Sequence, residues 1–117
     1  MGIELYITRA RFWAENEASP ISEDEWLSFI ASDPELSLDT SAGPYFARWH
    51  GESAYEEPWL AWSRGNISSK WPDTALYRKM LRIAEALGGT VQDDDGTVYR
   101  LPTDWEFDPR SAGMSDA

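Results

Sequence analysis

The feature that most constrains the fold of this chain is a pair of segments with helical periodicity, separated by short segments in which apolar and polar residues alternate. The stronger segment follows Trp71-Pro72-Asp73, and its apolar residues recur at helical spacing at Leu76, Met80, Ile83, Ala84 and Leu87. Asp73 is placed to cap the free N–H groups at the start, and Gly88-Gly89 ends the pattern. We therefore predict an amphipathic helix that runs from just after Asp73 to Leu87.

The other helix-type segment begins at Ser22. Glu25 stands three positions later and completes the pattern of a capping box, while the run Glu23-Asp24-Glu25 suits the positive end of a helix dipole. Trp26, Phe29 and Ile30 share one face of such a helix. We expect this helix to end at Asp33-Pro34, because the residue before a proline is pushed away from helical geometry.

The rest of the chain is typical of short strands. Alternating or apolar stretches separated by turn-forming residues occupy Met1 to Ile7, Leu36 to Leu38, Tyr45 to His50, Trp59 to Ser63, Asn66 to Lys70, Thr90 to Gln92 and Thr97 to Tyr99. Arg64-Gly65-Asn66 and Asp93-Asp94-Asp95-Gly96 are typical of hairpin turns.

This pattern predicts one α+β domain over residues 1–108, followed by a disordered tail over 109–117. We expect the order β-α-β-β-β(-β)-α-β-β, with two amphipathic helices packed on one face of a mostly antiparallel sheet. Trp105 and Phe107 in the last part of the domain are candidates to pack back onto it.

The composition excludes several classes of function. The 117 residues include no cysteine, which removes disulfides, thiolate catalysis and cysteine-based zinc sites. No stretch approaches the roughly 18 apolar residues of a membrane span. The first residues lack the basic end and apolar core of a secretory signal. These features predict a soluble, cytoplasmic protein with no cofactor.

The formal net charge of −11 is concentrated in parts of the chain. Nine acids face three bases from Met1 to His50, and seven face two from Asp93 to Ala117, whereas Ser63 to Gln92 holds two acids and five bases. Such a field repels nucleic acid and anionic lipid and accelerates encounter with cationic proteins. The plainer interpretation is that the acidity serves solubility alone.

No catalytic or metal-ligating pattern stands out. The consecutive acids Asp93, Asp94 and Asp95 lack the alternate spacing and distant glutamate of a calcium loop. His50, the single histidine, has no nucleophile in a known motif, so a structural or interface role is favoured. We predict that the chain is not an enzyme and holds no metal.

Seven tryptophans make aromatic contacts the better candidates. Trp59 and Trp62 fall on opposite faces of a strand, so one of them is expected to be exposed, and an exposed tryptophan beside Glu56 and Glu57 would suit a basic partner. A sugar-binding aromatic platform is the competing explanation. Acidic side chains without a local helix-capping or dipole role complete the predicted contact set, which is Glu15, Glu17, Trp49, Glu56, Glu57, Trp59, Asp93, Asp94 and Asp95.

Several segments together resemble small acidic bacterial immunity-type proteins associated with secreted polymorphic or type VI toxins. They are Gly2-Ile3-Glu4-Leu5-Tyr6-Ile7-Thr8-Arg9, Ile21-Ser22-Glu23-Asp24-Glu25-Trp26, Ser32-Asp33-Pro34-Glu35-Leu36, Gly43-Pro44-Tyr45-Phe46-Ala47 and Ala86-Leu87-Gly88-Gly89-Thr90-Val91-Gln92-Asp93-Asp94-Asp95-Gly96.

The resemblance implies a protein that neutralises a cognate toxin with a basic surface, a nuclease or another enzymatic toxin, by occluding its functional surface. It implies no direct contact with nucleic acid or membrane. The alternatives are an acidic regulatory or nucleic-acid-mimic protein without a toxin partner, and a small hydrolase that uses His50 or Asp93 to Asp95.

Overall fold

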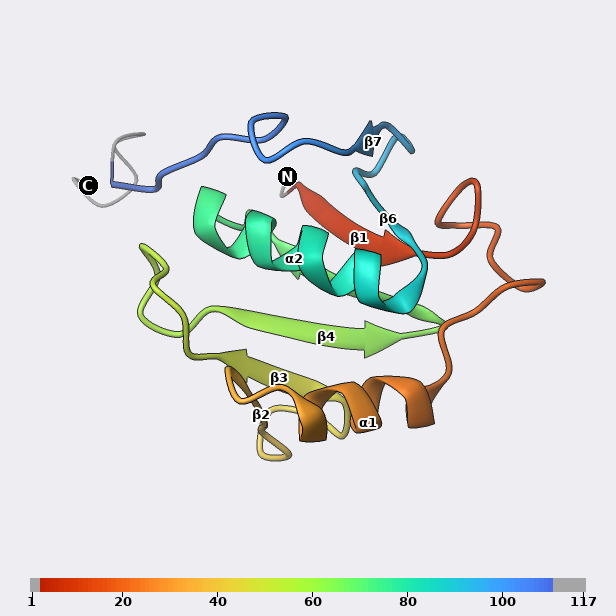
Figure 1. Cartoon of the computed structure of the whole chain (residues 1–117), viewed down its shortest axis with the longest axis horizontal. Coiled ribbons are helices and arrows are strands. Elements are labelled where there is room, and N and C mark those ends of the chain that lie inside the picture. The colour runs from red at the N-terminus through yellow and green to blue at the C-terminus, as the bar shows by residue number, and fades with distance from the viewer. Residues whose placement is uncertain (1–2, 111–117) are drawn as a thin grey trace.

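The computed structural model describes residues 3–110, which form two helices and a seven-stranded antiparallel sheet in one α+β arrangement (Figure 1). In chain order the elements are β1 (Glu4–Thr8), α1 (Glu23–Ser32), β2 (Leu36–Leu38), β3 (Phe46–Trp49), β4 (Trp59–Ser63), β5 (Asn66–Lys70), α2 (Thr74–Leu87), β6 (Thr90–Gln92) and β7 (Val98–Tyr99). The strands lie in the order β2-β3-β4-β5-β1-β6-β7. The predicted fold class and element order are confirmed, including the optional fourth strand between the helices.

Both helices begin at the predicted caps. The Ser22 hydroxyl accepts the Glu25 N–H at 3.1 Å and the Glu25 carboxylate accepts the Ser22 N–H at 3.0 Å, which closes the capping box of α1. The Asp73 carboxylate accepts the Leu76 N–H at 3.2 Å at the start of α2. Gly88 ends α2 in the left-handed region, with φ 74°, where a residue without Cβ pays no steric cost.

The two faces of the sheet differ because side chains alternate along each strand. Leu5 and Ile7 of β1 are fully buried beneath the helices, in one core with Trp26 of α1 and Tyr77 and Met80 of α2. Figure 1 shows α1 and α2 on the same side of the sheet. The opposite side is covered by neither helix, and we call it the open face.

Two ion-pair clusters tie elements that are distant in sequence. The Lys79 ammonium of α2 lies 2.7 Å from the Asp33 carboxylate and 2.9 Å from that of Glu35, so it joins α2 to the turn after α1. The Arg9 guanidinium donates to the Glu25 carboxylate and, at 2.7 Å, to the Leu87 carbonyl at the end of α2.

The Glu25 carboxylate predicts an acid-sensitive contribution to stability. Hydrogen bonds from Arg9, and then from the Ser22 backbone, lower the pKa of Glu25 from 4.5 to about 2. Because the folded-state pKa lies below the unfolded one, this stabilisation is present above about pH 4.5 and is lost as the pH falls toward about 2. We expect Glu25→Gln to flatten the loss of stability over this range in denaturant titrations at stepped pH. Glu17 is exposed and its side chain makes no hydrogen bond with residues 3–110, so Glu17→Gln should keep the wild-type dependence of stability on pH. An E25Q variant with the wild-type pH dependence would contradict the assignment.

The chain after β7 crosses the start of α2 without regular structure. The Trp105 indole donates to the Pro72 carbonyl at 2.8 Å, and the Phe107 backbone exchanges hydrogen bonds with the Thr74 hydroxyl, so both aromatic residues pack back. At the start of the predicted tail, Pro109 is buried and Arg110 pairs with Asp108. The remainder of the predicted tail, 111–117, lies outside the described residues.

Within residues 3–110, neither helix has the length and apolar character needed to cross a bilayer.

Candidate functional site

The open face carries two aromatic pairs, one on each side of its centre. The first pair is Tyr6 of β1 and Trp13 of the following loop, stacked with ring centroids 3.9 Å apart and an interplanar angle of 6°. Trp13 is fixed by its backbone N–H to the Gln92 side chain at 3.0 Å, by its indole N–H to the Asp94 carbonyl at 3.1 Å, and by the Asn66 side chain at 2.9 Å on its carbonyl. The loop after β1 thus folds back onto the open face.

The second pair is Phe46 of β3 and Trp59 of β4, whose ring centroids lie 5.3 Å apart at 21°. The Arg48 guanidinium lies 4.9 Å from the centre of the Phe46 ring. It also pairs with Asp39 at 3.0 Å and with Glu57 at 3.7 Å, so its charge is neutralised within the protein. Stacking and ion pairing hold this second pair in place.

Between the two pairs the open face carries small side chains, and we call this strip, from Phe46 and Trp59 to Tyr6 and Trp13, the trough. The strand register aligns Phe46 with Ala61, Ala61 with Ser68, and Ser68 with Tyr6. Three inter-strand spacings separate Phe46 from Tyr6, or roughly 14 Å. This backbone span is close to the diameter of an α-helix with its side chains, about 10 to 12 Å, and the bordering rings occupy part of it. A hollow of about 310 Å³ lies against Tyr6, Trp13 and Ser68 at one side of this strip.

Two carboxylates, those of Glu4 and Asp94, lie beside Tyr6, and Arg64 lines the same hollow. The Tyr6 hydroxyl donates to the Asp94 carboxylate at 3.0 Å and contacts that of Glu4 at 3.3 Å, while the Ser68 hydroxyl donates to Glu4 at 2.8 Å. Burial first, and then the hydrogen bond to Asp94, raise the pKa of Tyr6, so its hydroxyl stays a neutral donor. Within residues 3–110, no Lys or Arg forms an ion pair with either carboxylate.

The structure corrects two of the tryptophan predictions. Trp49 is 6% exposed, because its register partner is Leu36 on the helix side, and its indole donates to Glu35 at 3.0 Å. It is therefore not a surface contact. Trp59 and Trp62 do lie on opposite faces, but both are half-buried, so the prediction that one is exposed is wrong. Trp62 packs on the helix side and donates to the Ile21 carbonyl at 2.8 Å, which leaves Trp59 as the open-face residue.

The predicted acidic contacts fall into three groups around the sheet. Glu15 and Glu17 are exposed on the loop that carries Trp13, and Glu56 and Glu57 are exposed on the loop that leads into Trp59.

The third group lies in the β6–β7 turn, where its members have different roles. The Asp93 carboxylate accepts the N–H groups of Asp95 and Thr97 at 2.9 and 3.0 Å and the Tyr99 hydroxyl at 2.9 Å, so it serves the hairpin. Asp94 reaches the open face and Asp95 is exposed.

Four open-face residues were missed by the sequence reasoning: Glu4, Tyr6, Trp13 and Phe46. Period-two alternation could have found the first two, because Glu4 and Tyr6 share the face opposite Leu5 and Ile7. For Trp13 no local signal exists, since its position depends on contacts with Gln92 and Asp94 far along the chain.

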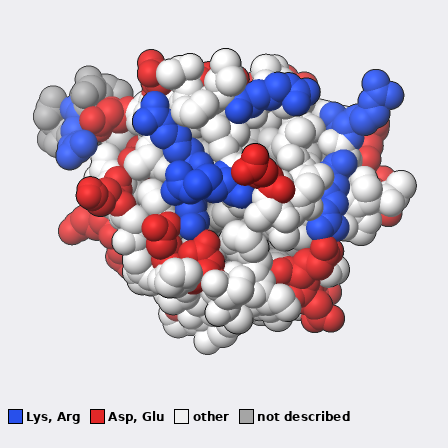
Figure 2. All heavy atoms as spheres, in the orientation of Figure 1, with Lys and Arg blue, Asp and Glu red and all other residues white. Residues whose placement is uncertain are grey.

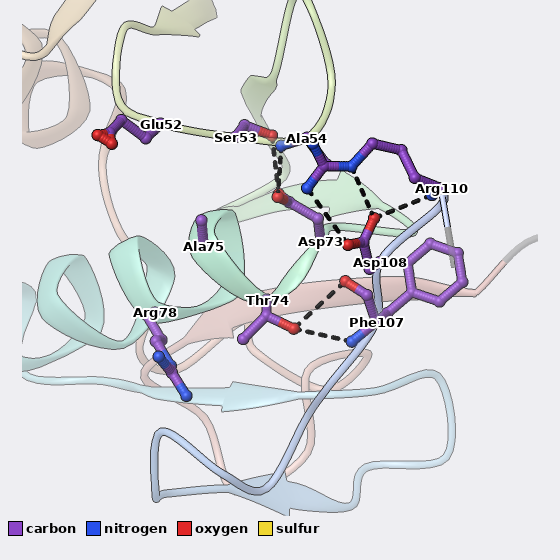
Figure 3. A pocket seen from close by; sticks show the side chains of 10 residues that line it. All are labelled: Glu52, Ser53, Ala54, Asp73, Thr74, Ala75, Arg78, Phe107, Asp108 and Arg110. Atoms are coloured by element: carbon purple, nitrogen blue, oxygen red, sulfur yellow. Dashed lines mark hydrogen bonds and ion pairs between the residues drawn. The ribbon is translucent and has the colours of Figure 1, made fainter. Parts of the chain in front are cut away.

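A hollow of about 450 Å³ at the start of α2 has a structural explanation (Figure 3). Asp73 points into the loop before β4, where it accepts the Ser53 hydroxyl and the Ala54 N–H at 2.8 Å each, besides capping α2. Asp73 is 4% exposed. Its oxygens are therefore occupied in joining the loop to the helix.

His50 does not form part of a catalytic set in the described chain. Its Nε2 lies 2.7 Å from the Ser37 hydroxyl oxygen, on an exposed edge of the sheet. In a catalytic triad a carboxylate orients the histidine through its second ring nitrogen. No carboxylate of residues 3–110 hydrogen-bonds to that nitrogen of His50.

Across the same residues, no cluster of three or more potential metal ligands occurs. Comparison of the chain with protein-family models, with curated proteins and with solved structures found no match. The trough is accordingly interpreted from its own geometry.

Proposed function

We propose that this chain is an immunity-type protein that binds a cognate bacterial toxin in the cytoplasm and neutralises it by occluding its active or functional surface. The observation that carries the proposal is the trough of the open face, bordered by two aromatic pairs and, at Tyr6, by two carboxylates that form no ion pair within residues 3–110. The resemblance to acidic immunity-type proteins adds to it.

The trough suits a protein partner for physical reasons. Tyrosine and tryptophan rings dominate interface energetics, and rings already held by stacking and hydrogen bonds lose little entropy on binding. Glu4 and Asp94 offer charge-assisted hydrogen bonds to a Lys or Arg of the partner. The exposed Glu15, Glu17, Glu56 and Glu57 add a negative rim, and net charge −11 accelerates encounter with a basic protein.

Inhibition by occlusion needs no chemistry from this chain. A partner helix or hairpin held across the trough would be shielded for as long as the complex lasts, so slow dissociation is the property that matters. A nuclease is an attractive target, since a cleft that binds polyanions is itself basic. Other enzymatic toxins with a basic functional surface fit the same site.

Co-expression tests the proposal directly. We expect the chain to rescue growth of cells that express the toxin encoded beside its gene, and to form a complex with the toxin domain in size-exclusion chromatography. Rescue should be lost in a Trp13→Ala/Trp59→Ala double variant and kept in Leu38→Ala, which shortens an exposed apolar residue on the helix side. Absence of both rescue and complex would refute the proposal.

The same assay separates a dedicated inhibitor from a nucleic-acid mimic. A mimic owes its affinity to many carboxylates, so its binding falls steeply with salt and does not depend on any one aromatic residue. If the double tryptophan variant binds as tightly as wild type while salt abolishes binding, charge mimicry replaces the trough as the explanation.

A further inference from the structure

The helix side carries a second hollow whose charge is opposite to that of the chain. Basic side chains gather over α2, with acidic ones mostly toward the margins of the view (Figure 2). A hollow of about 440 Å³ lies between α2 and the β6–β7 hairpin, and its lining includes Leu81, Ala84, Tyr99 and Pro102 together with Arg82 and Arg100. It therefore combines apolar walls with two guanidinium groups, in a protein of net charge −11.

Neither of these two arginines forms an ion pair within the described part of the chain, although the charge of Arg82 helps to lower the pKa of Glu35. Neither Arg82 nor Arg100 donates a side-chain hydrogen bond or forms an ion pair there, whereas Arg9, Arg48 and Arg110 are each paired with carboxylates. Glu85 is the one acidic residue that lines the hollow. An acidic chain that leaves two arginines unpaired beside an apolar wall presents a surface complementary to carboxylates.

Hydrogen bonds hold the backbone at the rim of the hollow. The Asp104 carboxylate accepts the N–H groups of Arg100 and Leu101 at 2.8 Å each, and the Tyr77 hydroxyl donates to the Leu101 carbonyl. Arg78 of α2 donates to the Pro102 carbonyl at 3.3 Å. This turn holds the Leu101 side chain outward at 59% exposure, the highest of any large apolar residue in the described chain.

We propose that this hollow is a second docking surface, separate from the trough and independent of the proposed function, for an acidic polypeptide segment with an apolar anchor. Carboxylates of the segment pair with Arg82 and Arg100, and its apolar side chain packs against Leu81, Tyr99 and Leu101. Guanidinium groups favour carboxylates through paired N–H donors.

A peptide titration tests this second surface. The probe is a fluorescein-labelled amphipathic peptide with Leu on one face and Glu at every charged position, and its matched control has Lys at those positions. We expect the Glu peptide to bind and the Lys peptide to leave the amide resonances of Tyr99, Arg100 and Leu101 unshifted. An Arg82→Glu/Arg100→Glu double variant should weaken binding of the Glu peptide at least about tenfold.

Arg64→Glu/Lys70→Glu is the control variant, because it makes the same change of net charge away from this hollow. Failure of the Glu peptide to bind, equal loss in both variants, or resonance shifts confined to the open face would each overturn the inference. So would a concentration-dependent dimer abolished by R82E/R100E, since the occupant would then be a second copy of the chain. Toxin binding should be unchanged in R82E/R100E, which keeps this result distinct from the test of the trough.

Discussion

Replacing Lys79 with alanine is expected to lower the free energy of unfolding by about 3 kcal/mol. The Lys79 side chain is 7% exposed and its ammonium lies within 3 Å of both the Asp33 and the Glu35 carboxylates. Its removal takes away the cation that pairs with both carboxylates at the point where α1, β2 and α2 meet. Because Glu35 is 48% exposed and can be solvated, the effect should fall at the lower end of the range for broken buried pairs.

Urea unfolding followed by tryptophan fluorescence measures this effect. Lys70→Ala is the matched control, because the Lys70 side chain is exposed and makes no hydrogen bond or ion pair with the described residues, and we expect it to change stability by less than about 0.5 kcal/mol. The pKa of Glu35 is lowered mainly by its hydrogen bond from Lys79 and then by that from Trp49, so K79A should also raise the pH at which Glu35 titrates. If K79A and K70A unfold at the same urea concentration, the contacts among Lys79, Asp33 and Glu35 contribute little to stability.

Sequence reasoning succeeded where the signals are local. The Ser22–Glu25 capping box, the Asp73 cap and the positive φ of Gly88 are each determined by residues within one helical turn, and all three lie at the predicted positions. The Arg64–Gly65 turn, with φ of 53° and 87°, joins β4 and β5 as its sequence predicts. None of these local signals predicts the strand order. The order depends on the pairing of β1 with β5 and β6, which lie far from it in the sequence.

The candidate site was harder to predict because it depends on register and on long-range contacts. Alternation within β4 correctly places Trp59 and Trp62 on opposite faces of the sheet, but it does not predict the solvent exposure of either side chain. Trp49 looked like a strand margin, and only its pairing with Leu36 reveals that it faces the helices. Trp13 belongs to a loop whose path is set by the side chains of Asn66 and Gln92. No spacing in the sequence contains that information.

The second large effect concerns the trough, where Trp59→Ala is expected to weaken toxin binding by about 2 kcal/mol or more, or roughly 30-fold. Trp59 stacks on Phe46 and lies next to the exposed Glu57. Its truncation therefore removes contact area and lets water reach an ion pair that Glu57 makes with the partner. Trp13→Ala should have a similar effect, because it removes the ring that covers Tyr6 beside Glu4 and Asp94. Isothermal titration calorimetry with the toxin domain measures both.

The control must separate lost contacts from lost structure. Leu38→Ala shortens an exposed apolar side chain of β2 on the helix side and should leave toxin affinity within about twofold of wild type, since it lies away from the trough. Tyr6→Phe keeps the ring stacked on Trp13 but removes the hydroxyl that contacts Asp94 and Glu4. If binding depends on those carboxylates reaching a basic partner, their Glu4→Gln/Asp94→Asn variant should lose affinity and salt sensitivity together, while Y6F retains most of both. Retention of full affinity in the tryptophan and carboxylate variants alike would place the toxin contact on another face.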